Sequence, residues 1–363
     1  MTYSVYQHWD PLKVCIVGRS YPPEFYKFIT NHRILTVMER IARETEEDYQ
    51  KLISLLESFG VEILRPNIKN SAEFYTHNGK ILPPPMCPRD FTAIVGDTFY
   101  IDQSTVEHKW EIPTGHDWPL TPSTNYFEVF DYAWKDIINQ VKKNVKSIQY
   151  NQGVNTATLT RVGKNLFLGT SDPRPNWELD KIQKQFQYRF SNYRCNVLNI
   201  GGHSDGTFFP VKPGLIISLK DIPTYSDTFP GWEVIYLPGQ SWDKVDAFLK
   251  LKKKNRGKWW VQREELNDDF TNFVEEWISH WVGYVEETVF DVNMLVINEQ
   301  NVIVNNYNKQ VFDAFKRHNI TPHIINFRHR YFWDGGIHCI TSDLHREGTM
   351  QDYFPDYKET QFV

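Results

Sequence analysis

Pro88-Arg89-Asp90-Phe91-Thr92 opens an apolar run that continues to Ile101 and is interrupted by Gly96-Asp97. Two short apolar runs on either side of a glycine-containing dipeptide are typical of a β-hairpin. This stretch therefore predicts a strand, a tight turn and a second strand, with the carboxylate of Asp90 at the mouth of the hairpin.

The same arrangement recurs along the chain, each time with polar residues ahead of a pair of apolar strands. The later copies open with Asn155-Thr156-Ala157-Thr158-Leu159, His203-Ser204-Asp205, Phe290-Asp291-Val292-Asn293 and Ile337-His338-Cys339. Three of these copies turn at Gly163-Lys164, Pro213-Gly214 and Asn298-Glu299. The sequence therefore predicts a repeated hairpin.

Helices are expected between the hairpins, because apolar residues there recur at three- and four-residue intervals. The predicted helices span roughly Arg40–Phe59, Tyr126–Lys143, Trp177–Ser191, Trp242–Leu251, Asp268–Val282 and Asn308–His318. Short apolar strands follow several of them, at Val61–Leu64, Asn196–Ile200, Val234–Leu237 and His323–Asn326. A strand-hairpin-helix unit used about five times indicates a closed array around an axis.

If the array closes, the residues that open the hairpins face one central site. These residues are Asp90, Asn155 or Thr158, His203 with Asp205, Asn293, and Cys339. The alternative is that they are ordinary polar residues at strand ends.

Cys339 is the candidate nucleophile of that site. It follows Gly335-Gly336, where the backbone can approach a ligand closely, and a thiolate there can attack a substrate. Its candidate partner is His203, since catalytic Cys and His residues are usually distant in sequence and meet in the fold. Taken singly, a buried cysteine is more often core packing, and a histidine beside glycines is often a turn residue.

Several motifs, spread over nearly the whole chain, resemble those of the arginine:glycine amidinotransferase family, within the guanidine-modifying α/β-propeller superfamily. They are Trp9-Asp10-Pro11-Leu12 with Val17-Gly18-Arg19, Pro88-Arg89-Asp90, Phe127-Glu128, His203-Ser204-Asp205-Gly206-Thr207-Phe208 and Gly335-Gly336-Ile337-His338-Cys339. The resemblance implies a five-fold pseudosymmetric α/β-propeller, with residues 1–363 as a single domain.

The resemblance also assigns roles to individual residues. Cys339 corresponds to the family's nucleophile and His203 to its general acid/base, while Asp90 and Asp205 correspond to the carboxylates that hold the guanidinium group. Arg89, Asn293 and Lys220 complete the expected substrate-binding set. Thr158 stands where the family has an aspartate behind the catalytic histidine, and Ile222 stands at the position of the family's arginine for the donor carboxylate, with Lys220 nearby as a substitute.

The chemistry of a guanidinium group requires these residue types. The group is planar and permanently charged, so a site must offer acceptors in its plane together with negative charge. Cysteine attack and histidine-assisted departure of an amine leave an amidino group on sulfur, which a second amine such as glycine accepts. The expected activity is therefore amidino transfer from L-arginine or a related guanidine. The alternatives are a hydrolase with water as acceptor and a non-catalytic guanidine-binding propeller.

Composition limits the remaining classes. The net charge of −5 argues against general nucleic-acid binding, and the basic run Lys250–Lys258 is expected to be a solvated loop or helix end. Four scattered cysteines indicate a reduced, cytoplasmic setting, and no apolar run is long enough for a membrane. No metal or organic cofactor is expected, because no step of this reaction requires one. The loop residues Glu107, His108, Glu111 and His116 also lack the spacing of a metal site. The expected partners are the guanidine donor and the amine acceptor, with a homodimer as the candidate assembly.

Overall fold

The computed structural model describes residues 2–77, 79–102, 124–151, 156–170, 174–199, 203–219, 225–237, 259–282 and 291–356. Five three-stranded sheets lie within these residues. In each of them two strands pair antiparallel, and a third joins in parallel.

The five sheets follow one another along the chain. They consist of β5 (Thr92–Val95), β6 (Thr98–Asp102) and β7 (Ser147–Asn151); β8 (Leu159–Val162), β9 (Asn165–Gly169) and β10 (Arg194–Leu198); β11 (Phe208–Lys212), β12 (Leu215–Ser218) and β13 (Glu233–Tyr236); β14 (Leu295–Asn298), β15 (Asn301–Val304) and β16 (Thr321–Ile324); and β17 (Thr341–Arg346), β1 (Leu12–Val17) and β2 (Glu62–Leu64). The predicted hairpins are the antiparallel pairs of the first four sheets.

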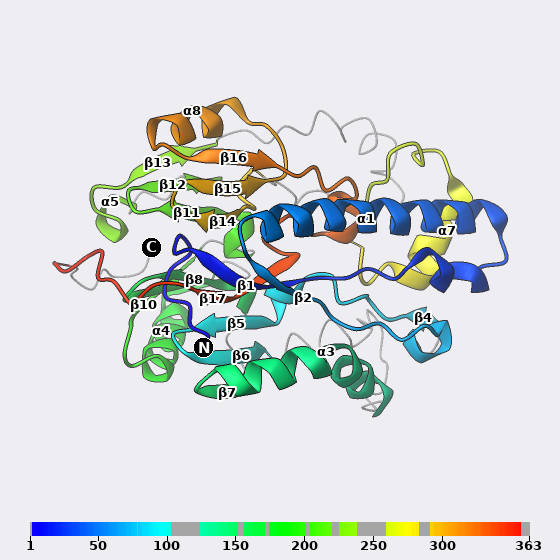
Figure 1. The fold of residues 1–363 in the computed structure, drawn as a ribbon, viewed down its shortest axis with the longest axis horizontal. Coiled ribbons are helices and arrows are strands. Elements are labelled where there is room, and N and C mark those ends of the chain that lie inside the picture. The colour runs from blue at the N-terminus through cyan, green and yellow to red at the C-terminus, as the bar shows by residue number, and fades with distance from the viewer. Residues whose placement is uncertain are drawn as a thin grey trace.

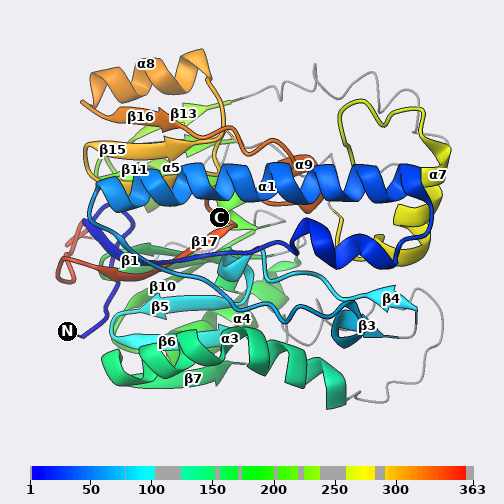
Figure 2. The same ribbon diagram turned by 45° about the vertical axis from the view of Figure 1, so that its right-hand side comes forward.

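A helix precedes the third strand of each sheet, because two parallel strands need a crossover connection. These helices are α3 (Thr124–Asn144), α4 (Asn176–Arg189), the short α5 (Tyr225–Thr228), α8 (Lys309–Arg317) and α1 (His32–Ser58). Figures 1 and 2 show α8 and α3 on opposite outer sides of the molecule, with the sheets between them.

The fifth sheet closes the array by joining the two ends of the described chain. β17 pairs antiparallel with β1, with Leu12 opposite Arg346 and Val17 opposite Thr341, and β2 lies on the other side of β1. Five similar modules arranged in this way confirm the predicted five-fold α/β-propeller.

Helix α1 begins eight residues before its predicted start at Arg40. Asn31 caps it, because its side-chain oxygen accepts hydrogen bonds from the backbone N–H groups of Arg33 (3.0 Å) and Ile34 (3.4 Å). Helices α3, α4 and α8 lie within one or two residues of prediction, whereas the short helices α5 and α9 (Arg330–Trp333) were not predicted. The predicted Asp268–Val282 helix divides into α7 (Asp268–Phe273) and a π-helical turn, η6 (Val274–Ile278). The predicted helix Trp242–Leu251 lies outside the described residues.

The remaining elements are short. They are β3 (Thr76–His77), β4 (Lys80–Ile81), α9 (Arg330–Trp333) and the 3₁₀ turns η1 (Pro23–Phe28), η2 (Ala72–Tyr75), η3 (Pro88–Asp90), η4 (Thr156–Thr158) and η5 (Ser204–Gly206).

Helix α1 anchors the segment that leads to Cys339. Arg328 Nε donates to Asp48 Oδ2 (2.9 Å), and Trp333 Nε1 donates to Thr45 Oγ1 (2.8 Å). Asp48 and Thr45 are both buried on α1. These contacts fix α9 and the residues just before it against a long helix.

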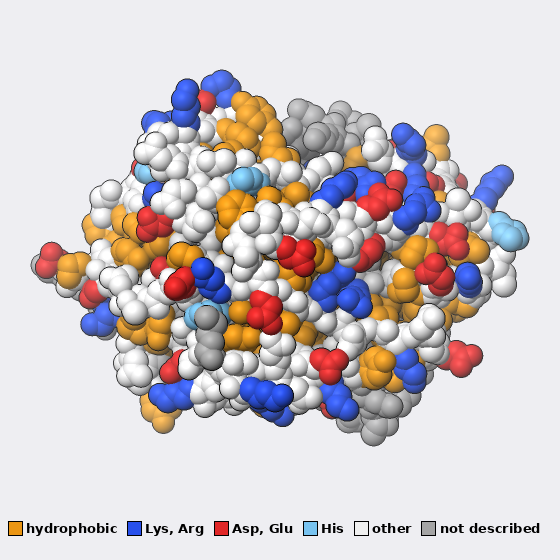
Figure 3. Space-filling view, viewed as in Figure 1, with side chains coloured by type: hydrophobic (Ala, Val, Ile, Leu, Met, Phe, Trp, Pro, Cys, Tyr) orange, Lys and Arg blue, Asp and Glu red, His pale blue; other side chains and the backbone are white. Residues whose placement is uncertain are grey.

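Acidic and basic side chains are interspersed on the face of the molecule shown in Figure 3. Among the described helices, none has both the length and the apolar character needed to cross a membrane. All four cysteines lie in the described part, and each is buried as a free thiol.

Candidate active site

The predicted site residues lie at the openings of the five sheets. Each precedes the first strand of its sheet by one to three positions, and each is buried, with at most 8% of its surface exposed. These residues are Asp90, Thr158, Asp205, Asn293 and Cys339. The turns η3, η4 and η5 also adjoin one another in sequence order. The openings therefore meet in one buried region.

Three of these side chains each lie in a turn that a threonine hydroxyl holds. Its hydroxyl donates to the carbonyl oxygen four residues earlier, and the site residue occupies the middle of that turn. The bonds run from Thr92 to Pro88 around Asp90 (2.7 Å), from Thr207 to His203 around Asp205 (3.2 Å) and from Thr341 to Ile337 around Cys339 (2.9 Å). The same local device thus presents two carboxylates and the thiol.

Cys339 contacts two of the predicted residues directly. Asn293 Nδ2 donates to the Sγ atom at 2.9 Å, and Sγ lies 3.5 Å from Asp205 Oδ2. Asn293 also accepts a hydrogen bond from the backbone N–H of His338 through its Oδ1 atom (2.8 Å). Asn293 therefore positions the nucleophile and its backbone together, and its predicted contact with substrate stays a prediction.

The thiol of Cys339 is held in its neutral form. Burial raises its pKa well above the ordinary value, and the negative charges of Asp205 and Asp90 raise it further, while the hydrogen bond from Asn293 opposes them. A cation placed among these groups would offset part of the negative charge of the two carboxylates. The site is thus prepared for a positively charged ligand beside the sulfur.

His338 holds the carboxylate of Asp205 and is the residue that sequence reasoning missed. Its Nδ1 atom lies 2.8 Å from Asp205 Oδ2, while Asp205 Oδ1 has no hydrogen-bond partner among the described residues. Burial lowers the pKa of His338, so the neutral ring donates its Nδ1–H. The ring is packed edge-on against Phe209 (5.2 Å between centroids) and His8 (5.9 Å).

Asp205 remains a carboxylate despite its burial. Burial alone raises its pKa, but the hydrogen bond from His338 and the positive charges around it outweigh that effect and lower the pKa to about 2. Its second oxygen, Oδ1, is therefore a charged acceptor with spare capacity.

His203 stands at the edge of the site with 40% of its side chain exposed. Its Nδ1 atom lies 3.9 Å from Asp90 Oδ1. The charge of Asp90 also raises the pKa of the Cys339 thiol. Thr158 is buried in the neighbouring turn η4. Its predicted role behind His203 stays a prediction.

Arg89 has internal contacts. Its guanidinium donates to the carbonyl oxygen of Leu159, and its backbone carbonyl accepts from Thr156 Oγ1 at 3.1 Å. Its backbone N–H donates to the carbonyl oxygen of Cys339 at 3.4 Å. Arg89 thus ties together the first, second and fifth modules, and substrate binding by its side chain stays a prediction.

Some predicted residues cannot be placed. Asn155, Lys220, Ile222 and the loop residues Glu107, His108, Glu111 and His116 lie outside the described residues. Within the described part of the chain, no group of three or more His, Cys, Asp or Glu side chains is arranged to hold a metal ion.

The chain is similar over almost its whole length to amidinotransferases, in keeping with its α/β-propeller fold. Glycine amidinotransferase, mitochondrial, from Xenopus tropicalis is 22% identical over 394 residues, covering 96% of this chain and 84% of that protein. L-arginine:L-lysine amidinotransferase from Pseudomonas savastanoi pv. phaseolicola is 20% identical, covering 96% and 95% of the two chains.

A solved structure matches over the same extent. Inosamine-phosphate amidinotransferase from Streptomyces griseus superposes with a TM-score of 0.62 at 18% identity, covering 97% of this chain and 99% of that one. No protein-family model matches the chain. The predicted resemblance to amidinotransferases, a class of transferase enzymes, is confirmed.

Proposed function

We propose that the protein is an amidinotransferase that moves an amidino group from L-arginine or a related guanidine to an amine such as glycine, through a covalent intermediate on Cys339. The observation that carries this proposal is the position of the Cys339 sulfur, 3.5 Å from a carboxylate oxygen of Asp205. A guanidinium bound to that carboxylate would place its central carbon beside the sulfur.

Binding of the donor would use Asp205 and Asp90. Asp205 Oδ1 is available to accept a charge-assisted hydrogen bond from one edge of the planar guanidinium. Asp90 supplies the second negative charge beside the thiol. The cation would offset the charges that keep the thiol protonated, so binding and activation of the nucleophile are coupled.

The first half-reaction breaks the bond between the guanidinium carbon and the substituted nitrogen. The sulfur of Cys339 bonds to the carbon, the thiol proton passes through His203 to the departing nitrogen, and a neutral amine leaves. The exposed edge of His203 suits this role, because the amine must exit toward solvent. An amidino group remains on sulfur.

The second half-reaction runs in the opposite direction with a new amine. His203 takes a proton from the acceptor amine, whose nitrogen bonds to the amidino carbon while the carbon–sulfur bond breaks. The proton returns to sulfur and restores the thiol. The alternative acceptor is water, which would release urea from the amidino intermediate. A citrulline-type product would require ammonia, and not the substituted amine, to leave in the first step, so that water attacks an intermediate that still carries the donor's tail.

The test is mass spectrometry of the intact protein after incubation with arginine, with the Cys339→Ser variant as control. The expected result is a mass increase of one amidino group, lost in the variant and discharged when glycine is added. Release of guanidinoacetate identifies transfer, release of urea without added amine identifies hydrolysis of the amidino intermediate, and release of citrulline identifies departure of ammonia in the first step. A protein that binds guanidines but never gains mass would instead be a binding propeller.

A further inference from the structure

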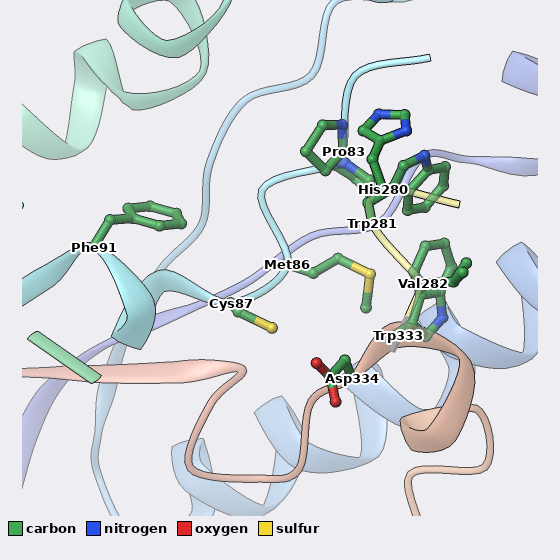
Figure 4. A pocket seen from close by; sticks show the side chains of 10 residues that line it. Pro83, Met86, Cys87, Phe91, His280, Trp281, Val282, Trp333 and Asp334 are labelled. Carbon is green, nitrogen blue, oxygen red and sulfur yellow. The ribbon is translucent and has the colours of Figure 1, made fainter. Parts of the chain in front are cut away.

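A cavity of about 160 Å³ lies beside the candidate active site. The segment between β4 and η3, the residues after η6 and the end of α9 form it (Figure 4). We call it the tail cavity. Its lining residues are Pro83, Pro84, Met86, Cys87, Phe91, His280, Trp281, Val282, Trp333 and Asp334.

The lining of the tail cavity is aromatic and apolar, with one carboxylate. Trp281 and Trp333 stack with their ring centroids 5.1 Å apart, and Asp334 follows Trp333 directly. No lysine or arginine is among the described residues that line it. Burial lowers the pKa of His280 to about 4, so this histidine is neutral at pH 7.

The tail cavity adjoins the nucleophile across Gly335. A methyl group added to Gly335 would lie 2.9 Å from the Sγ atom of Cys87, which lines the cavity, and 3.7 Å from the Cβ atom of Cys339. Figure 4 shows the sulfur of Cys87 and the side chains of Met86, Trp333 and Asp334 around one space. Gly335 therefore lies between the wall of the cavity at Cys87 and the side chain of Cys339.

We propose that the tail cavity receives the part of a guanidine substrate beyond its guanidinium group, and that it selects a tail ending in an ammonium group over one that carries a carboxylate. This inference rests on the proposed function. The faces of tryptophan rings and the carboxylate of Asp334 would both stabilise a bound cation. A carboxylate placed there would lose water without meeting a lysine or arginine on the described walls.

The size of the tail cavity agrees with such a tail. A volume of about 160 Å³ is close to that of cavities that hold one benzene molecule, about 150 Å³. A four-carbon chain with a terminal ammonium group fits that space. Decarboxylated arginine, 4-aminobutylguanidine, is therefore the expected substrate type.

The experiment measures the rate of adduct formation on Cys339 with four guanidines. These are methylguanidine, which has no tail, butylguanidine, 4-aminobutylguanidine and arginine. We expect 4-aminobutylguanidine to exceed arginine in rate at subsaturating concentration by about tenfold, because an unpaired carboxylate is costly to bury. We expect Asp334→Asn to lower the rate with 4-aminobutylguanidine about two- to fivefold, as for loss of an exposed ion pair, and to leave butylguanidine unchanged.

Two further variants complete the design. Trp281→Leu should slow the reactions of butylguanidine and 4-aminobutylguanidine about threefold and leave that of methylguanidine unchanged, since only a tail reaches the indole. Asp313→Asn, an exposed carboxylate on α8, is the matched control and should change no rate.

The outcomes separate this inference from the proposed function. If methylguanidine forms an adduct and arginine forms one at least as fast as 4-aminobutylguanidine, the selection of an ammonium tail is overturned. If no guanidine forms an adduct, the proposed reaction is wrong, and calorimetry with butylammonium then tests the tail cavity alone. Binding that is lost in Asp334→Asn supports the selection of an ammonium group, and absence of binding overturns it.

Discussion

His338 donates a 2.8 Å hydrogen bond to the same oxygen of Asp205 that lies 3.5 Å from the sulfur of Cys339. Two consecutive residues of the chain thus meet one carboxylate atom from the third module. The other oxygen of Asp205 is left for a ligand. Most of the following predictions therefore concern the charge or the position of Asp205.

Replacement of the nucleophile should abolish turnover without unfolding the protein. Cys339→Ser exchanges sulfur for oxygen at a buried position of nearly the same size, and a serine hydroxyl with an ordinary pKa is a far weaker nucleophile than a thiolate. Product assays and circular dichroism check the two halves of this prediction. Near-native activity in the variant would contradict the covalent mechanism.

Removal of either carboxylate charge should weaken guanidine binding. Asp205→Asn and Asp90→Asn keep the size of the side chain but replace a charge-assisted hydrogen bond by a neutral one, at a cost of about 1.5 to 3 kcal/mol. Calorimetric titration in the Cys339→Ser background measures the affinity without turnover. Unchanged affinity in both variants would mean that the guanidinium is held elsewhere.

The same two variants should make Cys339 more acidic. The pKa of this thiol is raised by burial and by the charges of Asp205 and Asp90, so removal of one charge lowers it. The pH at which iodoacetamide labels Cys339 should therefore shift downward in each variant, while Asp313→Asn on the surface leaves it unchanged. A midpoint that moves upward would contradict the electrostatic account of the site.

His338→Gln and His338→Ala should separate the position of Asp205 from its charge. The pKa of Asp205 is lowered to about 2 against the opposing effect of burial, chiefly by the hydrogen bond from His338, so loss of that donor raises it. Because the protonated acid cannot hold a cation, guanidine binding should fail at a higher pH in His338→Ala as the solution is acidified. His338→Gln keeps an N–H donor and should restore part of the acid tolerance.

The acid limb of the binding curve is the decisive measurement for His338. A purely structural role would lower stability in both variants equally and leave the pH at half-maximal binding where it is. Thermal unfolding of the same samples provides the control for stability.

The sequence could predict what depends on local pattern. Apolar periodicity gave α3, α4 and α8 to within two residues, and the dipeptide turns gave the hairpins. It placed the start of α1 too late: the buried residues Ile34, Val37, Met38 and Ile41 already have helical spacing, and the cap at Asn31 fixes where the helix begins. Boundaries of this kind depend on one side-chain hydrogen bond rather than on a pattern.

The role of His338 could not be predicted from the sequence, because its partner Asp205 is brought to it only by the meeting of two modules.

The sequence does carry one signal for the other site residues. A threonine stands two positions after Asp90, Thr158, Asp205 and Cys339 alike, in four of the five hairpin openings. In three of these openings the threonine hydroxyl holds the turn. A threonine two positions later is therefore shared by site residues whose own side chains differ in chemical type.

The pairing of β1 with β17 has a consequence for the order of folding. The hairpins of the other four sheets join neighbouring segments of chain, whereas the last sheet must bring Leu12 to Arg346. Contacts between such distant residues carry a high loop-closure cost and slow the folding of a chain. We therefore expect the ring to be sealed late, after the local hairpins have formed. Since Cys339 and His338 lie directly before β17, the thiol would meet Asp205 only at that final step, and partly folded chains would hold the carboxylates without a nucleophile.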